Sequence, residues 1–240
     1  MTFDDDREKV ERIHRRRLRG ADDLSDPEGL TRADHDGETF LVVSSSLSLE
    51  RNRVNDGLVR VRYRPDGDLP AEPMAGFRAW LLDHVPALAA PGRRKPDDDG
   101  LNVEGLAWDP ETSALLFGLR GPAVPGRVAL VHVPVDLGPK WTTESLGEPV
   151  LRTARLPRPA ASQGIRDLCC DGDLLVLLGR SASHDDASFR LGTWPRGGDA
   201  IRLLDVTFHR SAKPEGVTTF SDGGERKILV VDDNGGYAVL

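Results

Sequence analysis

The chain has 240 residues, of which 30% are charged and 38% are hydrophobic, and it contains 25 glycines and 17 prolines. This composition is typical of a soluble globular protein that turns often, and it excludes a disordered chain. The formal net charge of −7 disfavours a general affinity for nucleic acid or for anionic membranes. No apolar run approaches the roughly 20 residues that span a bilayer. The acidic start, Met1 to Asp6, lacks the apolar core of a signal peptide.

The only cysteines, Cys169 and Cys170, are adjacent. Neighbouring residues of a strand point to opposite faces, so the pair is not expected to form a disulfide. Core or near-core strand positions are expected for both thiols, and no CxxC metal spacing exists. A reducing compartment, the cytoplasm, is the simplest expectation unless an export signal is missing from the start of the chain.

Four segments share one plan, in which an acidic or charged residue and a small turn are followed by a polar loop and a short apolar strand. Their charged residues, which we take as equivalent, are Glu28, Glu104, Arg166 and Glu215. The apolar strands that follow are predicted at 40–44, 114–118, 174–179 and 228–232. Only the last interval between units matches the ~40–50 residues of a propeller blade, so the first two intervals must contain insertions.

Further strands are expected after each apolar run, and the first alternates apolar and basic residues as a half-buried strand should. They are predicted at 58–63, 127–133, 189–194 and 237–240, with an outermost strand of the third unit at 201–208. In the first insertion the apolar residues fall at helical spacing, which predicts a short helix from about Met74 to Val85. A polar loop follows it from Pro91 to Gly100.

These patterns predict an all-β protein: a β-propeller or partial propeller of about four to five four-stranded blades, with one inserted helix near 74–85. Residues 1–25 form an N-terminal segment, which could be the remnant of a preceding blade, and 26–240 form the propeller-like domain. The near-continuous apolar runs suit strands covered on both faces by neighbouring blades. An ordinary β-sandwich is the alternative.

Five phrases together resemble the DUF3616 family, an uncharacterised bacterial family similar to the phytase-like and SdiA-regulated propellers. They are Pro27-Glu28-Gly29-Leu30, Val103-Glu104-Gly105-Leu106-Ala107, Gly118-Leu119-Arg120-Gly121-Pro122, Gly164-Ile165-Arg166-Asp167-Leu168 and Pro214-Glu215-Gly216-Val217. The resemblance covers about Asp26 to Leu240 and implies a propeller without an established activity. The segment before Asp26 is too short for a whole preceding blade, which leaves the closure of the ring open.

Equivalent positions of successive blades point at one axis, so the repeated charges are the first candidates for a site. A ring of carboxylates needs a cation, a basic partner or protonation, and calcium suits such oxygen-rich sites. A mixed ring with arginines could instead hold an anion or neutralise itself. The structural alternative is that these residues cap strands and tie blades together. The candidate metal ligands are Glu28, Glu104, Asp167 and Glu215, and Arg120, Arg166 and Arg180 complete the candidate ligand-binding set.

Other motifs are weaker. The run Asp97-Asp98-Asp99-Gly100 lacks EF-hand spacing and indicates a solvated loop, while Asp232 to Gly236 is explained by hairpin turn chemistry. Ser181 to Asp186 contains the residue types of a catalytic triad without a reason for triad geometry, and an exposed loop is expected. The basic run Arg15 to Arg17 has no aromatic neighbours for stacking on bases, so a solvated helix or edge strand is expected.

Two functions remain open. The first is a binding propeller whose channel mouth recognises a small ligand or a protein partner. The second is a calcium-dependent hydrolase of an ester or phosphoester, in which metal-bound water would attack the substrate. The sequence does not decide whether the chain is an enzyme, and it indicates neither a nucleic-acid partner nor a membrane.

Overall fold

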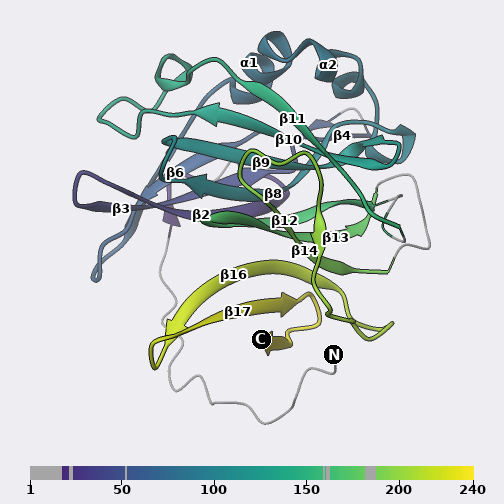
Figure 1. Cartoon of the computed structure of the whole chain (residues 1–240). Helices are drawn as coiled ribbons and strands as arrows, with labels where there is room; N and C mark the ends of the chain where they lie inside the picture. Colours follow the sequence, from purple (N-terminus) through teal and green to yellow (C-terminus); the bar gives the residue numbers. More distant parts are fainter. Residues whose placement is uncertain (1–17, 22–23, 52, 159, 161–162, 182–187) are drawn as a thin grey trace.

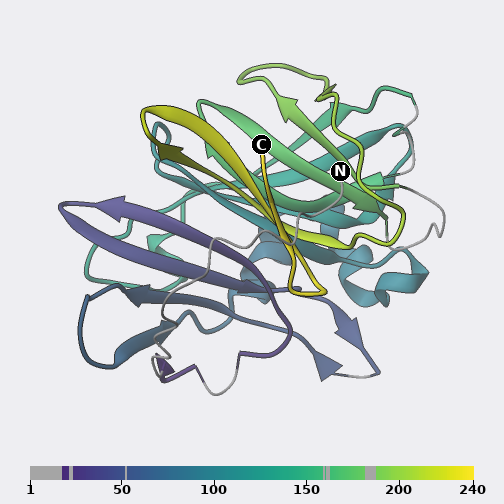
Figure 2. The same cartoon turned by 90° about the horizontal axis from the view of Figure 1, so that it is seen from below.

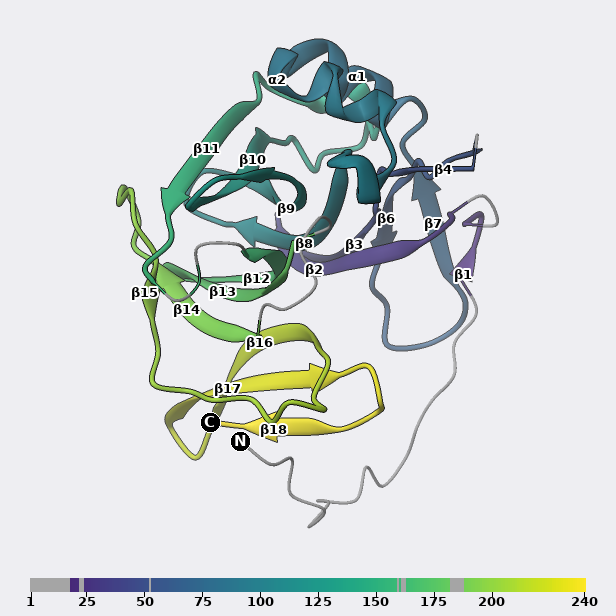
Figure 3. The same ribbon diagram turned by 90° about the vertical axis from the view of Figure 1, so that its right-hand side faces the viewer.

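The computed structural model describes residues 18–21, 24–51, 53–158, 160, 163–181 and 188–240. It contains four main β-sheets, which form the blades of a propeller. In Figure 3 the strands β2, β8, β12 and β16 lie around the centre, and the later strands of each sheet lie toward the periphery. The predicted propeller is therefore confirmed, and it has four blades.

The first blade has the strand order β1-β7-β6-β3-β2, and β4 and β5, which follow β3 in the sequence, form a separate two-stranded sheet. Strand β1 pairs in parallel with β7. It precedes Asp26, the residue at which the sequence predicts that the propeller-like domain begins. The strands are β1 (Leu18–Arg19), β2 (Pro27–His35), β3 (Glu38–Ser45), β4 (Leu49–Glu50), β5 (Arg53–Val54), β6 (Leu58–Arg62) and β7 (Leu69–Pro73).

The second and third blades each have four antiparallel strands, and the fourth has three. In Figure 2 the yellow fourth blade lies between the purple-to-blue first blade and the green third blade. The strands are β8 (Asn102–Asp109), β9 (Ala114–Val124), β10 (Arg127–Pro134), β11 (Val150–Arg155), β12 (Gln163–Asp171), β13 (Asp173–Arg180), β14 (Arg190–Trp194), β15 (Arg202–Leu203), β16 (Pro214–Asp222), β17 (Glu225–Asp232) and β18 (Tyr237–Val239).

Two predictions about strands need correction. The repeated charged phrases do not form turns and polar loops before a strand. Each is part of the innermost strand of its blade, and the predicted apolar strands are the second ones. The predicted strand at 201–208 is also wrong beyond β15, because Leu204, Val206 and Phe208 pack into the core between the third and fourth blades instead of continuing the ladder.

The predicted helix is confirmed as α1 (Phe77–His84), and a second short helix, α2 (Pro86–Ala89), follows it directly. The first helix ends at Val85 because a residue before proline disfavours the helical conformation. The expected polar loop contains two 3₁₀ turns, η1 (Pro91–Arg93) and η2 (Pro96–Asp98), and a third turn, η3 (Thr143–Ser145), precedes β11. Among the described residues no helix is long and apolar enough to cross a membrane.

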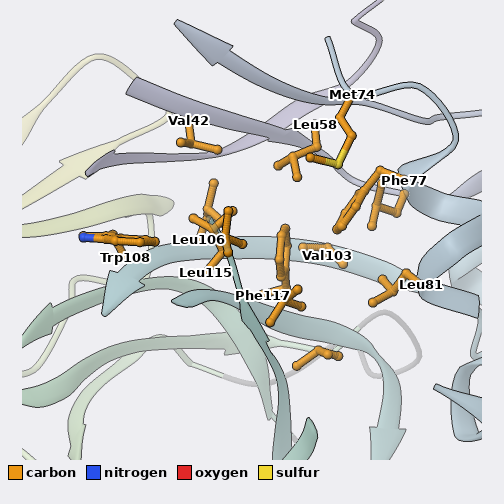
Figure 4. Packing of buried hydrophobic residues seen from close by; sticks show 14 of the residues in the cluster. Val42, Leu58, Met74, Phe77, Leu81, Val103, Leu106, Trp108, Leu115 and Phe117 are labelled. Carbon is orange, nitrogen blue, oxygen red and sulfur yellow. The ribbon is translucent and has the colours of Figure 1, made fainter. Parts of the chain in front are cut away.

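The largest core lies between the first and second blades, where α1 covers it (Figure 4). Phe77 of the helix contacts Phe117 of β9, with ring centroids 5.1 Å apart. Two further cores join the second blade to the third and the third to the fourth. Among the described residues no buried cluster joins the fourth blade to the first. The blades therefore form a chain of packed layers with a seam between its two ends.

Two glycines permit the close approach of the second and third blades. A Cβ on Gly118 would lie 2.5 Å from Cγ2 of Ile165, and one on Gly105 would lie 3.1 Å from the same atom. Both distances are shorter than an ordinary van der Waals contact, so a larger residue at either position must displace Ile165.

Gly118→Ala is expected to destabilise the protein by about 1–3 kcal/mol, because the added methyl overpacks the layer. In an unobstructed strand the same change would stabilise, since glycine has the higher conformational entropy when unfolded. Ile165→Ala should rescue part of this loss, so the double variant should lose less than the sum of the single ones in urea unfolding. The control is Gly118→Ala combined with Val230→Ala, at a residue of the fourth blade, for which the two losses of unfolding free energy should simply add. If the losses also add for Gly118→Ala with Ile165→Ala, the proposed contact does not exist.

Candidate functional site

The four charged positions share a structural feature. In each innermost strand the pairing register with the second strand shifts at the charged residue, as in a β-bulge. Bulges re-aim a side chain and leave an extra residue unpaired. The residues at the shifts are Glu28, Glu104, Arg166 and Glu215. The structure thus confirms that they are equivalent positions at one end of the channel, which we call the mouth.

Three of these residues and Arg120 of β9 form a network of alternating charge. The Glu104 carboxylate, only 3% exposed, lies 2.7 Å from Nη1 of Arg120 and 2.6 Å from Nη1 of Arg166. The other terminal nitrogen of Arg166 binds the carboxylate of Glu215. Asn102 also donates to Glu104, at 3.2 Å. The network joins the second, third and fourth blades and neutralises its own charges.

Glu28 is the member that the network leaves out. Among the described residues it makes neither a hydrogen bond nor an ion pair. Its side chain is exposed to solvent, although the walls of the mouth lie close to it. Partial desolvation by these walls, together with the negative charges of Glu104 and Asp26, raises the pKa of Glu28 to about 7. Glu28 is therefore an uncompensated carboxyl group that titrates near neutral pH.

A cavity of about 560 Å³ opens at the mouth. Of the candidate residues, Glu28, Glu104 and Arg120 line it. Sequence analysis missed its other polar residues, most of which come from β4 and the segments around it and from the insertion. These are Asp26, Ser48, Glu50, Arg51, Lys95 and Asp97, together with Asn102 at the start of β8. The acidic run at 97–99 was a weak signal for it, since Asp97 faces this cavity rather than only bulk solvent.

Asp167 does not belong to the charge network. Asp167 follows the bulge and occupies the position that glycine has in the other three units. Its carboxylate accepts a hydrogen bond from the backbone N–H of Val217 at 2.7 Å, and backbone groups of Leu168 and Leu106 also bond to it. It therefore joins neighbouring blades. Arg180 ends β13, and its carbonyl accepts a hydrogen bond from Nε of Arg120 at 3.1 Å.

The expected calcium site finds no support in this geometry. Arginine nitrogens occupy the positions between carboxylates that a cation would take. Among the described residues no group of three or more His, Cys, Asp or Glu side chains is placed to hold a metal ion. Calcium binding stays a prediction.

Both cysteines are free and half-buried. Cys169 lines a cavity of about 550 Å³ at the far end of the channel, with its sulfur 3.9 and 3.8 Å from the hydroxyls of Thr218 and Thr219. Cys170 lies outside the channel, in a cleft between the second and third blades.

The remaining motifs have structural roles or lie outside the described part. The hairpin predicted at Asp232 to Gly236 is confirmed between β17 and β18, where the carboxylate of Asp232 accepts a hydrogen bond from the backbone of Asn234 at 2.9 Å. Residues 182–186 of the serine- and histidine-containing loop, and the basic run at 15–17, lie outside the described residues.

The family model described as "Protein of unknown function (DUF3616)" matches residues 85–238, which is more than half of the chain. The chain belongs to this family. No curated protein matches this DUF3616 chain.

Three solved structures are similar to the chain at low identity. A GH43 glycoside hydrolase engineered at its active site has 12% identity and a TM-score of 0.47, over 90% of this chain and 39% of its own. The major Malassezia sympodialis allergen Mala s 1 has 10% identity and a TM-score of 0.46, over 89% of this chain and 75% of its own. An ancestral GH74 enzyme has 13% identity and a TM-score of 0.41, over 90% and 42%. The DUF3616 chain thus spans less than half of either enzyme, and these likenesses say nothing of its function.

Glu104→Gln is expected to destabilise the fold by about 3–5 kcal/mol, because it leaves two poorly solvated guanidinium groups without their shared counter-charge. Glu215→Gln should cost much less, since the Glu215 side chain is 35% exposed and pairs with a single arginine. Urea unfolding at neutral pH measures both. Equal, small losses would show that the network is not a buried constraint.

Glu28→Gln should change how stability depends on pH. The folded-state pKa of Glu28, about 7, lies above its usual 4.5, so the folded protein holds this proton more tightly than the unfolded chain does. Stability from this group is complete below about pH 4.5 and is lost as the pH rises to about 7. The melting temperature of Glu28→Gln minus that of the wild type should therefore increase from pH 5 to pH 8. A constant difference would contradict the raised pKa.

Proposed function

We propose that this DUF3616 domain binds a small polar ligand with a positively charged group at the channel mouth. The observation that carries the proposal is the Glu28 carboxylate, which faces the mouth without a partner while the equivalent residues pair among themselves. The neighbouring carboxylates repel the ionised form of Glu28, and a cationic ligand would relieve this repulsion.

The charges around Glu28 favour a cation over an anion. Glu104, Asp26 and Glu215 all raise its pKa, and Arg166 alone among the neighbouring charges lowers it. The charges that act on Glu28 are therefore mainly negative in spite of the nearby arginines. An ammonium or guanidinium group bound there would stabilise the ionised form of Glu28 and would release its proton.

The cavity is large enough for such a ligand and suits a polar one. Its volume of about 560 Å³ lies within the ~300–1,000 Å³ typical of small-molecule sites. Polar and charged side chains from the first blade, the insertion and the second blade converge on it, which supports hydrogen bonds to a ligand whose cationic group lies on Glu28. The observations give no comparable support to metal-dependent hydrolysis, because Glu104 and Glu215 already have arginine partners and no group of three or more His, Cys, Asp or Glu side chains among the described residues is placed to hold a metal ion.

The test is isothermal titration with amines and with alcohols of the same carbon skeleton, such as 1,4-diaminobutane and 1,4-butanediol. Amines should bind at least about tenfold tighter than their alcohols, since a charge-assisted hydrogen bond contributes about 1.5–3 kcal/mol. Their affinity should rise as the pH is raised through about 7, where Glu28 loses its proton.

Glu28→Gln should abolish the preference for amines. The matched control is Glu225→Gln, which removes the same charge from an exposed residue at the start of β17 and outside the cavity. If amines and alcohols bind equally, if no amine binds, or if the two variants behave alike, the proposed cationic site does not exist.

A further inference from the structure

A further cavity, of about 380 Å³, lies outside the channel, between the second and third blades. It opens beside Asp109, at the end of β8 opposite the mouth, and it shares no lining residue with the mouth cavity. Its walls come from β9, β10 and β11 on one side, and from β13 and the end of β14 on the other. It is the unfilled end of the packed layer between these blades.

Part of the wall of this interblade cavity is apolar and fixed. Leu116 and Leu130 are 3% and 1% exposed, and Trp194 opposite them is 5% exposed. The indole nitrogen of Trp194 donates to the carbonyl of Gly198 at 2.9 Å, which holds the ring in place. All three side chains belong to the core between the two blades, so the cavity continues that core outward.

The rim contributes one uncompensated positive charge. Arg196 already forms an ion pair, because its two terminal nitrogens donate to the carboxylate of Asp109 at 3.0 and 3.1 Å. Arg152 of β11 is exposed, and among the described residues it makes neither a hydrogen bond nor an ion pair. It pairs across the sheet with Leu130, so both side chains lie on the face that lines the cavity.

We propose that the interblade cavity binds a small amphipathic monoanion, with its apolar body against Leu116, Leu130 and Trp194 and its carboxylate on Arg152. Apolar surface combined with a charged group at the rim suits a small amphipathic molecule, and the cavity volume lies in the range common to small-molecule sites. The guanidinium fork matches a carboxylate with two parallel hydrogen bonds. Asp109 and Glu111 close to Arg196 disfavour a second negative charge.

Binding at this site is reversible rather than covalent. Cys170 lines the cavity, but burial raises the pKa of its thiol to about 11, with the charge of Asp109 acting in the same direction. At neutral pH the sulfur is a protonated thiol, which is a poor nucleophile.

The experiment compares 2-naphthoate with 2-naphthamide, which has the same ring system without the charge, by isothermal titration of the full chain. Naphthoate should bind at least about tenfold tighter. Arg152→Met should remove that difference and leave the weak binding of the amide. The control Arg202→Met, at an exposed arginine of β15 outside the cavity, should change neither affinity.

Trp194→Leu should weaken both compounds, because it removes part of the apolar wall, and Glu28→Gln should weaken neither. If Trp194→Leu fails to fold, the Arg152→Met comparison decides alone, since Arg152 is exposed. Failure of naphthoate to bind, or an unchanged preference in Arg152→Met, would overturn the proposal and would leave the mouth site unaffected.

Discussion

The structure depends on one buried carboxylate, that of Glu104, between two guanidinium groups. It is held by Arg120 from its own blade and by Arg166 from the next, and Arg166 continues to Glu215 in the fourth blade. Such a network contributes less net stability than apolar packing of the same volume would. Its effect is on geometry, because each charge can be satisfied only when three inner strands have the correct register. As a result, Arg120 and Arg166 are already paired within the network.

The unpaired Glu28 and the seam between the first and fourth blades both result from how the blades are joined. Buried cores join the first blade to the second, the second to the third, and the third to the fourth. Among the described residues neither an apolar core nor the charge network crosses from the fourth blade back to the first. Glu28 lies on β2, at the edge of that seam, and among the described residues it forms no ion pair with the nearby arginines. The chemistry of the mouth is thus a consequence of how the blades connect.

The sequence predicted the architecture because the repeat is local. The pattern of charge, small residues and apolar run recurs four times, and the equivalence of Glu28, Glu104, Arg166 and Glu215 follows from it directly. It did not predict that the charged phrases are themselves strands, since their polar residues mimic turns and their partners lie in other blades. Asp167 was misplaced for a related reason. The side chain of Asp167, one residue beyond the bulge, binds backbone groups of the neighbouring blades.

The sites depend on contacts that no local pattern encodes. Nothing near Arg152 in the sequence distinguishes it from other exposed arginines. Its role depends on Trp194, which comes from the next blade, and on Asp109, which holds Arg196 away from it. The mouth likewise collects Asp26, Arg51 and Lys95 from segments whose positions follow only from the insertion and its helices.

The recurring bulge separates the two ends of the channel. An extra residue in a strand shifts the alternation of side chains by one position. The residue at each bulge therefore departs from the regular alternation, while Thr31, Trp108 and Cys169, farther along the strands, line the opposite cavity. The two openings of the channel are thus lined by different parts of the same inner strands, and each opening has its own set of side chains.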